Sequence, residues 1–267
     1  MTFPNTSIIR KSTIFLAAAM LSFSAMAADF DQTQRLANQG DASAQKDLAL
    51  MYEYSDSVPH DYAKAFDWYT KAANQGGKGA QNTLARVYHF GMGDKKEYQD
   101  YAKALDWYTK AENYGKIGDM YHSGTGVRQD YAKALEWYTK SANQGSGTEH
   151  YKIGKMYFNG EGVRQDYAKA LDWYKKSSSL GYISPKFKIA DMYYQGQGVR
   201  QDYTEALKVY RPLADKGYAS AQFNLGVLYY EGQGVRQDKA EAKEWFGKAC
   251  DNGDQGGCDN YRMLNQR

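Results

Sequence analysis

The sequence predicts an all-α fold in which about six helix–turn–helix units follow one another as a solenoid. The first observation is a recurring phrase, Gly-x-Gly-Val-Arg-Gln-Asp-Tyr-Ala-Lys-Ala-Leu-Asp-Trp-Tyr in its fullest form. Variants of its second half begin at aspartates 61, 100, 130, 166, 202 and 238, and the last three intervals are all 36 residues. A fixed period of roughly 20 to 50 residues is typical of stacked repeats.

Helical periodicity within each unit is the second observation. In the copy that begins at Asp166, Ala170, Trp173, Tyr174 and Ser177 are spaced as on one face of a helix. An acid stands four residues before a lysine on the opposite face, which is the favourable order for a helix. These pairs are Asp67/Lys71, Asp106/Lys110, Glu136/Lys140, Asp172/Lys176 and Glu244/Lys248.

The third observation is that residues suited to begin and to end a helix recur in each unit. Each recurring aspartate is suited to cap the free N–H groups at the start of the second helix of its unit, helix B. Glycine suits the left-handed position that ends a helix, and we expect helix B to end near Gly76, Gly115, Gly145, Gly181, Gly217 and Gly253. A preceding helix of similar length, helix A, is predicted before each aspartate, for example at residues 219–230.

These residues resemble the Sel-1-like repeat (SLR) family, a relative of the tetratricopeptide repeats. The matching pieces include Ala219-Ser220-Ala221-Gln222, Leu225-Gly226, Tyr229 and the turn from Gly232 to Asp238. The resemblance covers nearly all of residues 28–267 in six units. It implies a right-handed α/α superhelix used mainly for protein–protein contact.

The first 27 residues have the pattern of a secretory signal peptide. Arg10 and Lys11 precede an apolar run at residues 14–23, and Ala25-Met26-Ala27 is a small-residue cleavage site. We expect cleavage after Ala27 and a periplasmic or secreted protein; the alternative is an uncleaved anchor. Residues 28–267 contain no second long apolar run, so we expect a single solenoid domain without stable membrane insertion.

A capping helix is predicted at residues 30–39 and the first helix A at 41–52, with an irregular turn at 55–59. The second turn, 91–99, is three residues longer than the others. Six residues are missing from helix A of the third unit, so we expect a disturbance between residues 113 and 121. It is either a neutral deletion absorbed by a local kink or a notch that a partner enters.

A last helix at residues 256–265 is predicted to cap the array, and the chain's two cysteines lie next to it. An even number of cysteines in a secreted chain favours a disulfide, here between Cys250 and Cys258. Their spacing is similar to that of the cysteine-rich secreted bacterial branch of the same family, which implies the same pairing. No CxxC motif or nearby histidine indicates a redox or metal role.

The sequence offers no set of residues that converges on catalysis. His60, His89, His122 and His150 lie in different units, so neither a metal nor a cofactor is expected. The net charge of +3 does not argue for nucleic acid. Ser43 to Lys46 fits the S-x-x-K motif, but the S-D-N and K-T-G partners are missing. We therefore expect no enzyme activity.

Two rows of residues are candidate binding surfaces, because equivalent positions of stacked repeats line up. The position directly after the helix A tyrosine holds Glu53 in the first unit and a ring-bearing residue in each later unit. These rings form a candidate partner-binding groove: His89, His122, Phe158, Tyr194 and Tyr230. The alternative is that they pack under the turn between helices A and B. A candidate basic edge consists of Arg128, Arg164, Arg200 and Arg236. The alternative is a solvated arginine neutralised by the aspartate two residues on.

These observations favour a non-catalytic secreted or periplasmic repeat protein that binds a protein partner through its concave groove, as a scaffold, adaptor, or host or envelope contact. One alternative is a periplasmic immunity protein that neutralises a delivered toxin. Another, implied by the cysteine-rich branch, is a penicillin-binding or weakly β-lactamase-like enzyme.

Overall fold

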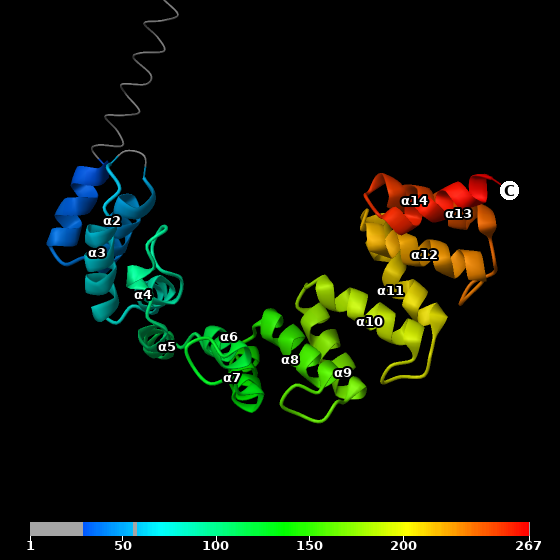
Figure 1. Ribbon diagram of the computed structural model, residues 1–267, viewed down its shortest axis with the longest axis horizontal. Helices are drawn as coiled ribbons and strands as arrows, with labels where there is room; N and C mark the ends of the chain where they lie inside the picture. Colours follow the sequence, from blue (N-terminus) through cyan, green and yellow to red (C-terminus); the bar gives the residue numbers. More distant parts are fainter. Residues whose placement is uncertain (1–28, 56–57, 267) are drawn as a thin grey trace, which may run out of the picture. The chain divides into compact units, whose positions relative to one another are not determined.

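The computed structural model describes residues 29–55 and 58–266, and the regular structure in these ranges is helical apart from one isolated bridge between Met92 and Lys95 (Figure 1). The predicted all-α class is therefore confirmed. The predicted signal peptide, residues 1–27, lies outside the described residues. The chain divides into two compact units between Gln129 and Asp130.

The first unit contains a helix at residues 29–38, where a capping helix was predicted, followed by helices that pack consecutively. They are α2 (Ala42–Tyr54), α3 (Tyr62–Asn74), α4 (Lys78–Phe90), the 3-10 helix η1 (Lys96–Tyr98), α5 (Tyr101–Lys110) and α6 (Tyr114–Ser123). The longer second turn accommodates η1, and its Met92 is buried in the core of this unit.

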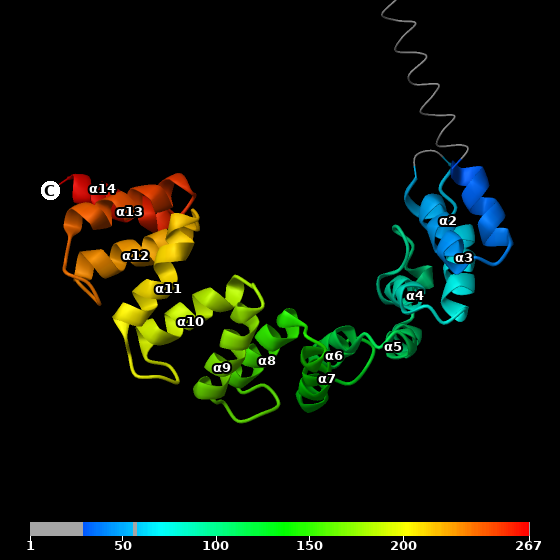
Figure 2. The ribbon, with the colours of Figure 1, turned by 180° about the vertical axis from the view of Figure 1, so that it is seen from behind.

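The second unit repeats the same pattern with more regular lengths, and both views show each helix beside the next (Figures 1 and 2). Its helices are α7 (Tyr131–Asn143), α8 (Gly147–Asn159), α9 (Tyr167–Ser179), α10 (Ser184–Gln195), α11 (Tyr203–Asp215), α12 (Ala219–Glu231), α13 (Lys239–Asp251) and α14 (Gln255–Asn265). The last helix begins one residue before the predicted start.

Aspartates cap helix B as predicted. The Asp166 carboxylate accepts the backbone N–H of Lys169 at 2.9 Å and forms an ion pair with the Lys169 ammonium at 3.6 Å. The backbone hydrogen bond is the main reason why the pKa of Asp166 lies below its ordinary value. The same cap recurs at Asp61, Asp100, Asp130, Asp202 and Asp238.

The second glycine of each turn sets the contact between successive repeats. Gly198 has a left-handed φ of +72°, and a Cβ atom there would lie 2.4 Å from the backbone carbon of Tyr167. Only glycine lets this turn rest directly on the start of helix B of the preceding repeat. Gly162 and Gly234 make the equivalent contacts with Tyr131 and Tyr203.

Alanines are buried in every repeat, and helix B of the first five repeats adds a buried tyrosine. In α9, Ala170, Tyr174 and Ser177 are buried as predicted, but Leu171 joins them while Trp173 is only half-buried. The tryptophan instead supports the lysine three residues later, since Lys176 Nζ lies 4.4 Å from its ring centroid. Among the described residues, five repeats show this stacking. Of the five predicted acid–lysine pairs, all within the described ranges, Asp106/Lys110 and Glu136/Lys140 form ion pairs and the other three do not.

The shortened stretch differs from the prediction in where the residues are lost. Helix α5 and helix α6 have 10 residues each, whereas α7 has 13, so the missing length is shared between helix B of the second repeat and helix A of the third. The prediction that Gly115 ends helix B was wrong, because Gly115 is buried inside α6. Glu112, with a left-handed φ of 54°, takes the closing place, since the shortened chain has no glycine there.

Candidate functional site

The predicted groove residues all lie at the end of a helix A, and all are partly exposed. The rings of His89, Phe158 and Tyr194 pack on the first residue of the following helix B. Ring centroids are 5.7 Å apart for His89 and Tyr101, 5.0 Å for Phe158 and Tyr167, and 5.2 Å for Tyr194 and Tyr203. Tyr230 has the Lys239 ammonium 5.6 Å from its ring centroid instead.

A glutamine in each turn fixes the backbone of this row. The Gln165 side-chain amide donates to the Phe158 carbonyl oxygen at 2.9 Å. The same bond is made to His89, His122, Tyr194 and Tyr230 by Gln99, Gln129, Gln201 and Gln237. In the first repeat His60 takes this place, with Nδ1 2.8 Å from the Glu53 carbonyl oxygen. Each ring is therefore partly covered by its contacts beside the turn, and the remainder of the side chain is accessible to solvent.

The arginines of the predicted basic edge are all exposed. The aspartate two residues after Arg128 pairs with Lys133 at 3.9 Å, and the one after Arg164 pairs with Lys169 at 3.6 Å. Within the described ranges, no carboxylate forms an ion pair with any of the four arginines, Arg128, Arg164, Arg200 and Arg236. Direct neutralisation by the neighbouring aspartate is therefore not observed, and the guanidinium groups remain available to an acidic partner.

A pocket of about 510 Å³ lies in the first unit between α2 and α4, with Tyr69 of α3 lining it as well. We call it the α2–α4 pocket, and its lining residues are Lys46, Leu50, Glu53, Tyr54, Tyr69, Thr83, Arg86, Val87, Phe90, Gly91 and Gly93. Pockets of this size accommodate small ligands or single large side chains. This pocket was not predicted, because residues of three helices contribute to its wall.

The buried carboxylate of the α2–α4 pocket belongs to Glu53, which is only 7% exposed. The Tyr69 hydroxyl donates to Glu53 Oε2 at 2.7 Å. Burial, followed by this hydrogen bond, raises the pKa of Tyr69 well above its ordinary value. A hydrogen bond with Glu53 also raises the pKa of Tyr54. The carboxylate is thus held by groups of its own repeat.

The opening of the α2–α4 pocket is apolar and positively charged. Tyr54 and Phe90 are 64% and 61% exposed, the highest values among the exposed large hydrophobic residues of the described chain, and Leu50 beside them is 38% exposed. Arg86 is exposed and makes no ion pair with any described residue. The Lys46 ammonium forms an ion pair with Asp47, with 3.6 Å between Nζ and Oδ1. Such a combination is typical of contact surfaces.

His89 Nδ1 and the Tyr108 hydroxyl are buried and have no hydrogen-bond partner among the described residues. Their ring centroids are 5.9 Å apart. Burial, helped by the positive charge of Lys116, lowers the pKa of His89. Burial raises the pKa of Tyr108 to about 12. Both groups are therefore neutral at physiological pH.

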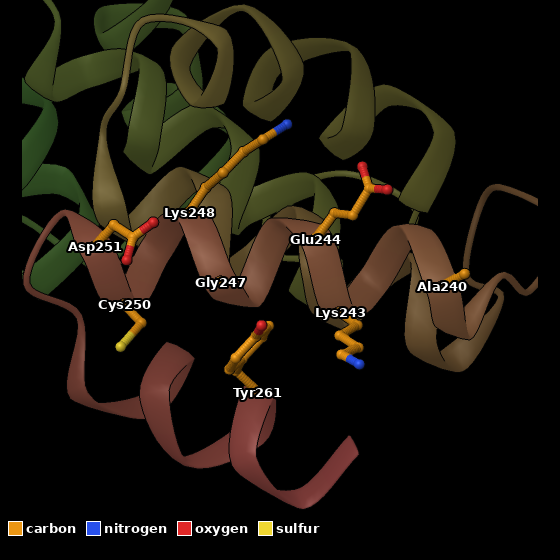
Figure 3. Close-up of a pocket in the computed structure, with 8 residues that line it drawn as sticks. All are labelled: Ala240, Lys243, Glu244, Gly247, Lys248, Cys250, Asp251 and Tyr261. Carbon is orange, nitrogen blue, oxygen red and sulfur yellow. The ribbon is translucent and has the colours of Figure 1, made fainter. Parts of the chain in front are cut away.

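The C-terminal end contains the disulfide between Cys250 and Cys258. A second pocket, of about 620 Å³, lies beside it between α13 and α14. Figure 3 shows that Tyr261 of α14 points toward Gly247 of α13, while Glu244 and Lys248 point away from α14. The Lys243 ammonium lies 5.7 Å from the Tyr261 ring centroid. The disulfide and this tyrosine together attach α14 to α13.

The remaining residues that were considered for catalysis or metal binding do not form a site. Ser43 is exposed in the first turn of α2, and Lys46 of the same motif is the residue that contacts Asp47. Across residues 29–55 and 58–266, no three His, Cys, Asp or Glu side chains are arranged to hold a metal ion. Within the same ranges, no helix combines the length and apolar character needed to cross a bilayer.

Comparison with known proteins identifies the class. The Sel1 repeat model matches residues 42–77, 79–113, 112–146, 150–182, 186–218 and 219–254, so this chain belongs to the Sel1 repeat family. Its fold is the family's solenoid of paired helices, as predicted. Sel1 repeat proteins typically act as scaffolds for protein–protein interaction.

Two solved structures are similar over most of the chain. The first is c5321, a protective antigen present in uropathogenic Escherichia coli strains that displays an SLR fold, with 29% identity and a TM-score of 0.75 over 89% of this chain. This chain spans 56% of the length of c5321. The second is a Sel1 repeat protein from Oxalobacter formigenes, with 30% identity and a TM-score of 0.69, covering 87% of this chain and 68% of that one. No curated protein sequence matches the chain.

Proposed function

We propose that this chain binds another protein through the ends of its helices A and that it has no catalytic activity. The observation that carries the proposal is the partly exposed ring that recurs at one structural place in consecutive repeats. In the second unit these rings are Phe158, Tyr194 and Tyr230. Aromatic side chains with fixed backbones bury a large area on binding and lose little rotational freedom.

The proposal places the protein in the periplasm or outside the cell. The sequence of residues 1–27 has the pattern of a cleavable signal peptide. The Cys250–Cys258 disulfide supports the same location, because such bonds persist in oxidising compartments. The similar protein c5321 is a protective antigen, which agrees with a location within reach of antibodies.

Affinity capture from an envelope extract tests the proposal. Protein purified after expression of the full chain serves as bait, in parallel with a Phe158→Ala/Tyr194→Ala double variant. The double variant is expected to lose at least about tenfold in affinity for the captured partner, which corresponds to about 1.4 kcal/mol. Leu180→Ala, which removes an apolar side chain that is 49% exposed just after helix B, is the matched control. Equal affinity of the double variant and the wild type would refute the proposal.

The basic edge is proposed as a secondary contact for an acidic partner. Replacing both Arg164 and Arg200 with glutamine removes two exposed charges that have no ion-pair partner in the described structure. Partner affinity is expected to fall and to depend less on salt, because fewer charges are screened. An affinity of the wild type that does not change with salt concentration would contradict this contact.

The non-enzymatic part of the proposal has its own test. A penicillin-binding or β-lactamase-like activity would need an activated Ser43, but this serine stands exposed in the first turn of α2. We expect no nitrocefin turnover by the purified chain. Turnover that is abolished by Ser43→Ala would show that the protein is an enzyme.

A further inference from the structure

The α2–α4 pocket departs from the repeat pattern at the residues that form its opening. When the repeats are superimposed on their helix A tyrosines, Leu50, Tyr54 and Phe90 correspond to Lys155, Asn159 and Gln195 of the fourth and fifth repeats. Positions that the solenoid needs for folding recur along the chain, as the capping aspartates do in all six repeats and the turn glycines in the later five. Leu50, Tyr54 and Phe90 occur as apolar residues in the first two repeats and are exposed there. The fold therefore does not require them.

The charge of the pocket departs from the pattern as well. In the fifth repeat Asp191 accepts the hydroxyl of the helix B tyrosine Tyr210. The equivalent residue of the second repeat is Arg86, and the corresponding Tyr108 hydroxyl has no acceptor among the described residues. Arg86 and Tyr69 line the same pocket. The positive charge of Arg86 partly offsets the rise that burial causes in the pKa of Tyr69 and of Tyr108. A carboxylate present in one repeat is thus replaced by a cation in another.

The available charges at the opening are therefore positive. Glu53 is buried and already accepts the Tyr69 hydroxyl, whereas Arg86 is exposed and without an ion-pair partner in the described chain. Lys46, whose ammonium already pairs with Asp47, is a second cation that lines the same pocket. A guanidinium group at a surface binds a carboxylate with charge-assisted hydrogen bonds. Tyr54 and Phe90 offer apolar area that only another apolar group would cover favourably.

We infer that the α2–α4 pocket binds a segment of the partner protein in which a large apolar side chain stands next to an aspartate or glutamate. The apolar side chain lies between α2 and α4 against Leu50, Tyr54 and Phe90, and its neighbouring carboxylate pairs with Arg86. This inference rests on the proposed function and specifies which partner chemistry the first unit recognises. The second unit, with polar residues in the equivalent places, does not bind this segment.

Peptide display tests the inference. A random dodecapeptide library is selected against the immobilised full chain and, in parallel, against the variant Leu50→Lys/Tyr54→Asn/Phe90→Gln, which carries the residues of the fourth and fifth repeats. All three side chains are at least 38% exposed, so the variant is expected to fold, as circular dichroism will verify. Peptides retained by the wild type alone are expected to carry a large apolar residue next to an acidic one.

One selected peptide is then titrated by fluorescence polarisation against single variants. Arg86→Glu is expected to weaken binding by at least about tenfold, and a peptide with lysine in place of its acidic residue should regain affinity for this variant. Arg35→Glu reverses an exposed arginine of the helix at residues 29–38, which is in the same unit but outside both proposed binding surfaces, and should leave the affinity unchanged.

Several outcomes would overturn the inference. They are a lack of any peptide that depends on the pocket, a preference for basic instead of acidic residues, and equal binding by Arg86→Glu and the wild type. A wild type that dimerises through this pocket, with dimerisation lost in the triple variant, would identify a second copy as the occupant and also overturn it. The proposed function fails separately, when the Phe158→Ala/Tyr194→Ala variant keeps full partner affinity.

Discussion

The two units share their framework and differ in the surfaces of their helices A. In the first unit the pair α2 and α4 exposes Leu50, Tyr54 and Phe90 around a pocket with Arg86 at its opening. In the second unit the corresponding residues of α8 and α10 are polar, and the accessible aromatic surface comes from the row at the helix ends. The same scaffold thus carries an apolar pocket in one unit and a row of rings in the other.

This difference separates the residues that build the repeat from those that give it a particular partner. Capping aspartates, turn glycines and buried helix B tyrosines occur in both units and explain the fold. The pocket opening varies between repeats at no cost to packing, because its side chains are exposed. In a repeat protein, local departures from an otherwise regular exposed pattern therefore indicate where binding specificity lies.

The largest predicted effect concerns the shared framework. Gly198→Ala should lower the free energy of unfolding by about 3 kcal/mol, because its Cβ atom would meet the Tyr167 backbone while φ stays left-handed. Gly181→Ala, at a left-handed φ in open space, should cost only about 1 kcal/mol. Urea unfolding followed by circular dichroism measures both. Similar losses for the two variants would show that the turn contact is unimportant.

The disulfide should stabilise only the end of the second unit. In the chain-entropy model, a loop of this length contributes about 2–3 kcal/mol. Replacing Cys250 and Cys258 with serine should therefore increase hydrogen exchange in α13 and α14 and leave α2 to α4 unchanged. Equal exchange of α14 in the variant and the wild type would contradict this role.

A third prediction compares two buried tyrosines of the first unit. Tyr69→Phe removes the hydroxyl that donates to Oε2 of the buried Glu53 and should cost about 1–3 kcal/mol. Tyr108→Phe removes a hydroxyl that has no partner among the described residues, so stability should change by less than about 0.5 kcal/mol or increase. Urea midpoints of the two variants measure the difference. Equal destabilisation would mean that Tyr108 has an acceptor in solution.

The smallest effect concerns pH. The pKa of His89 is lowered in the folded protein, so the unfolded chain binds its proton more readily. Stability contributed by neutral His89 is fully present above the ordinary histidine pKa and is lost as the pH falls below it. His89→Phe, which copies Phe158 of the second unit, should make the melting temperature less sensitive to acidification from pH 7 to pH 5. An unchanged pH dependence would contradict this assignment.

The repeated framework could be predicted from sequence because each cue is local. An aspartate at a helix start and a glycine at its end act through the neighbouring backbone, and the capped helices were found where expected. The prediction put the missing residues in the wrong place. Two helices, α5 and α6, are each shortened, and Glu112 instead of a glycine adopts the left-handed conformation between them. Nothing in the sequence alone says how a deletion is divided between adjacent helices.

The candidate site was predicted only in part. The row at the ends of helices A could be identified because equivalent positions align in stacked repeats. The α2–α4 pocket was missed, since it depends on how Glu53, Tyr69 and Arg86 from three helices meet. The departure of Leu50, Tyr54 and Phe90 from the polar residues of later repeats was the available signal. It becomes meaningful once the structure shows that these side chains are exposed.

Site-specific photo-crosslinking measures most directly whether the helix A surface is where the partner binds. A photoreactive amino acid is placed at Phe90 or Phe158, near the ends of helices A, and for comparison at Asp172 or Leu180 at exposed sites on or just after helix B. Our account predicts covalent adducts with the partner from the first two sites and none from the last two. Adducts formed mainly from positions 172 and 180 would contradict it.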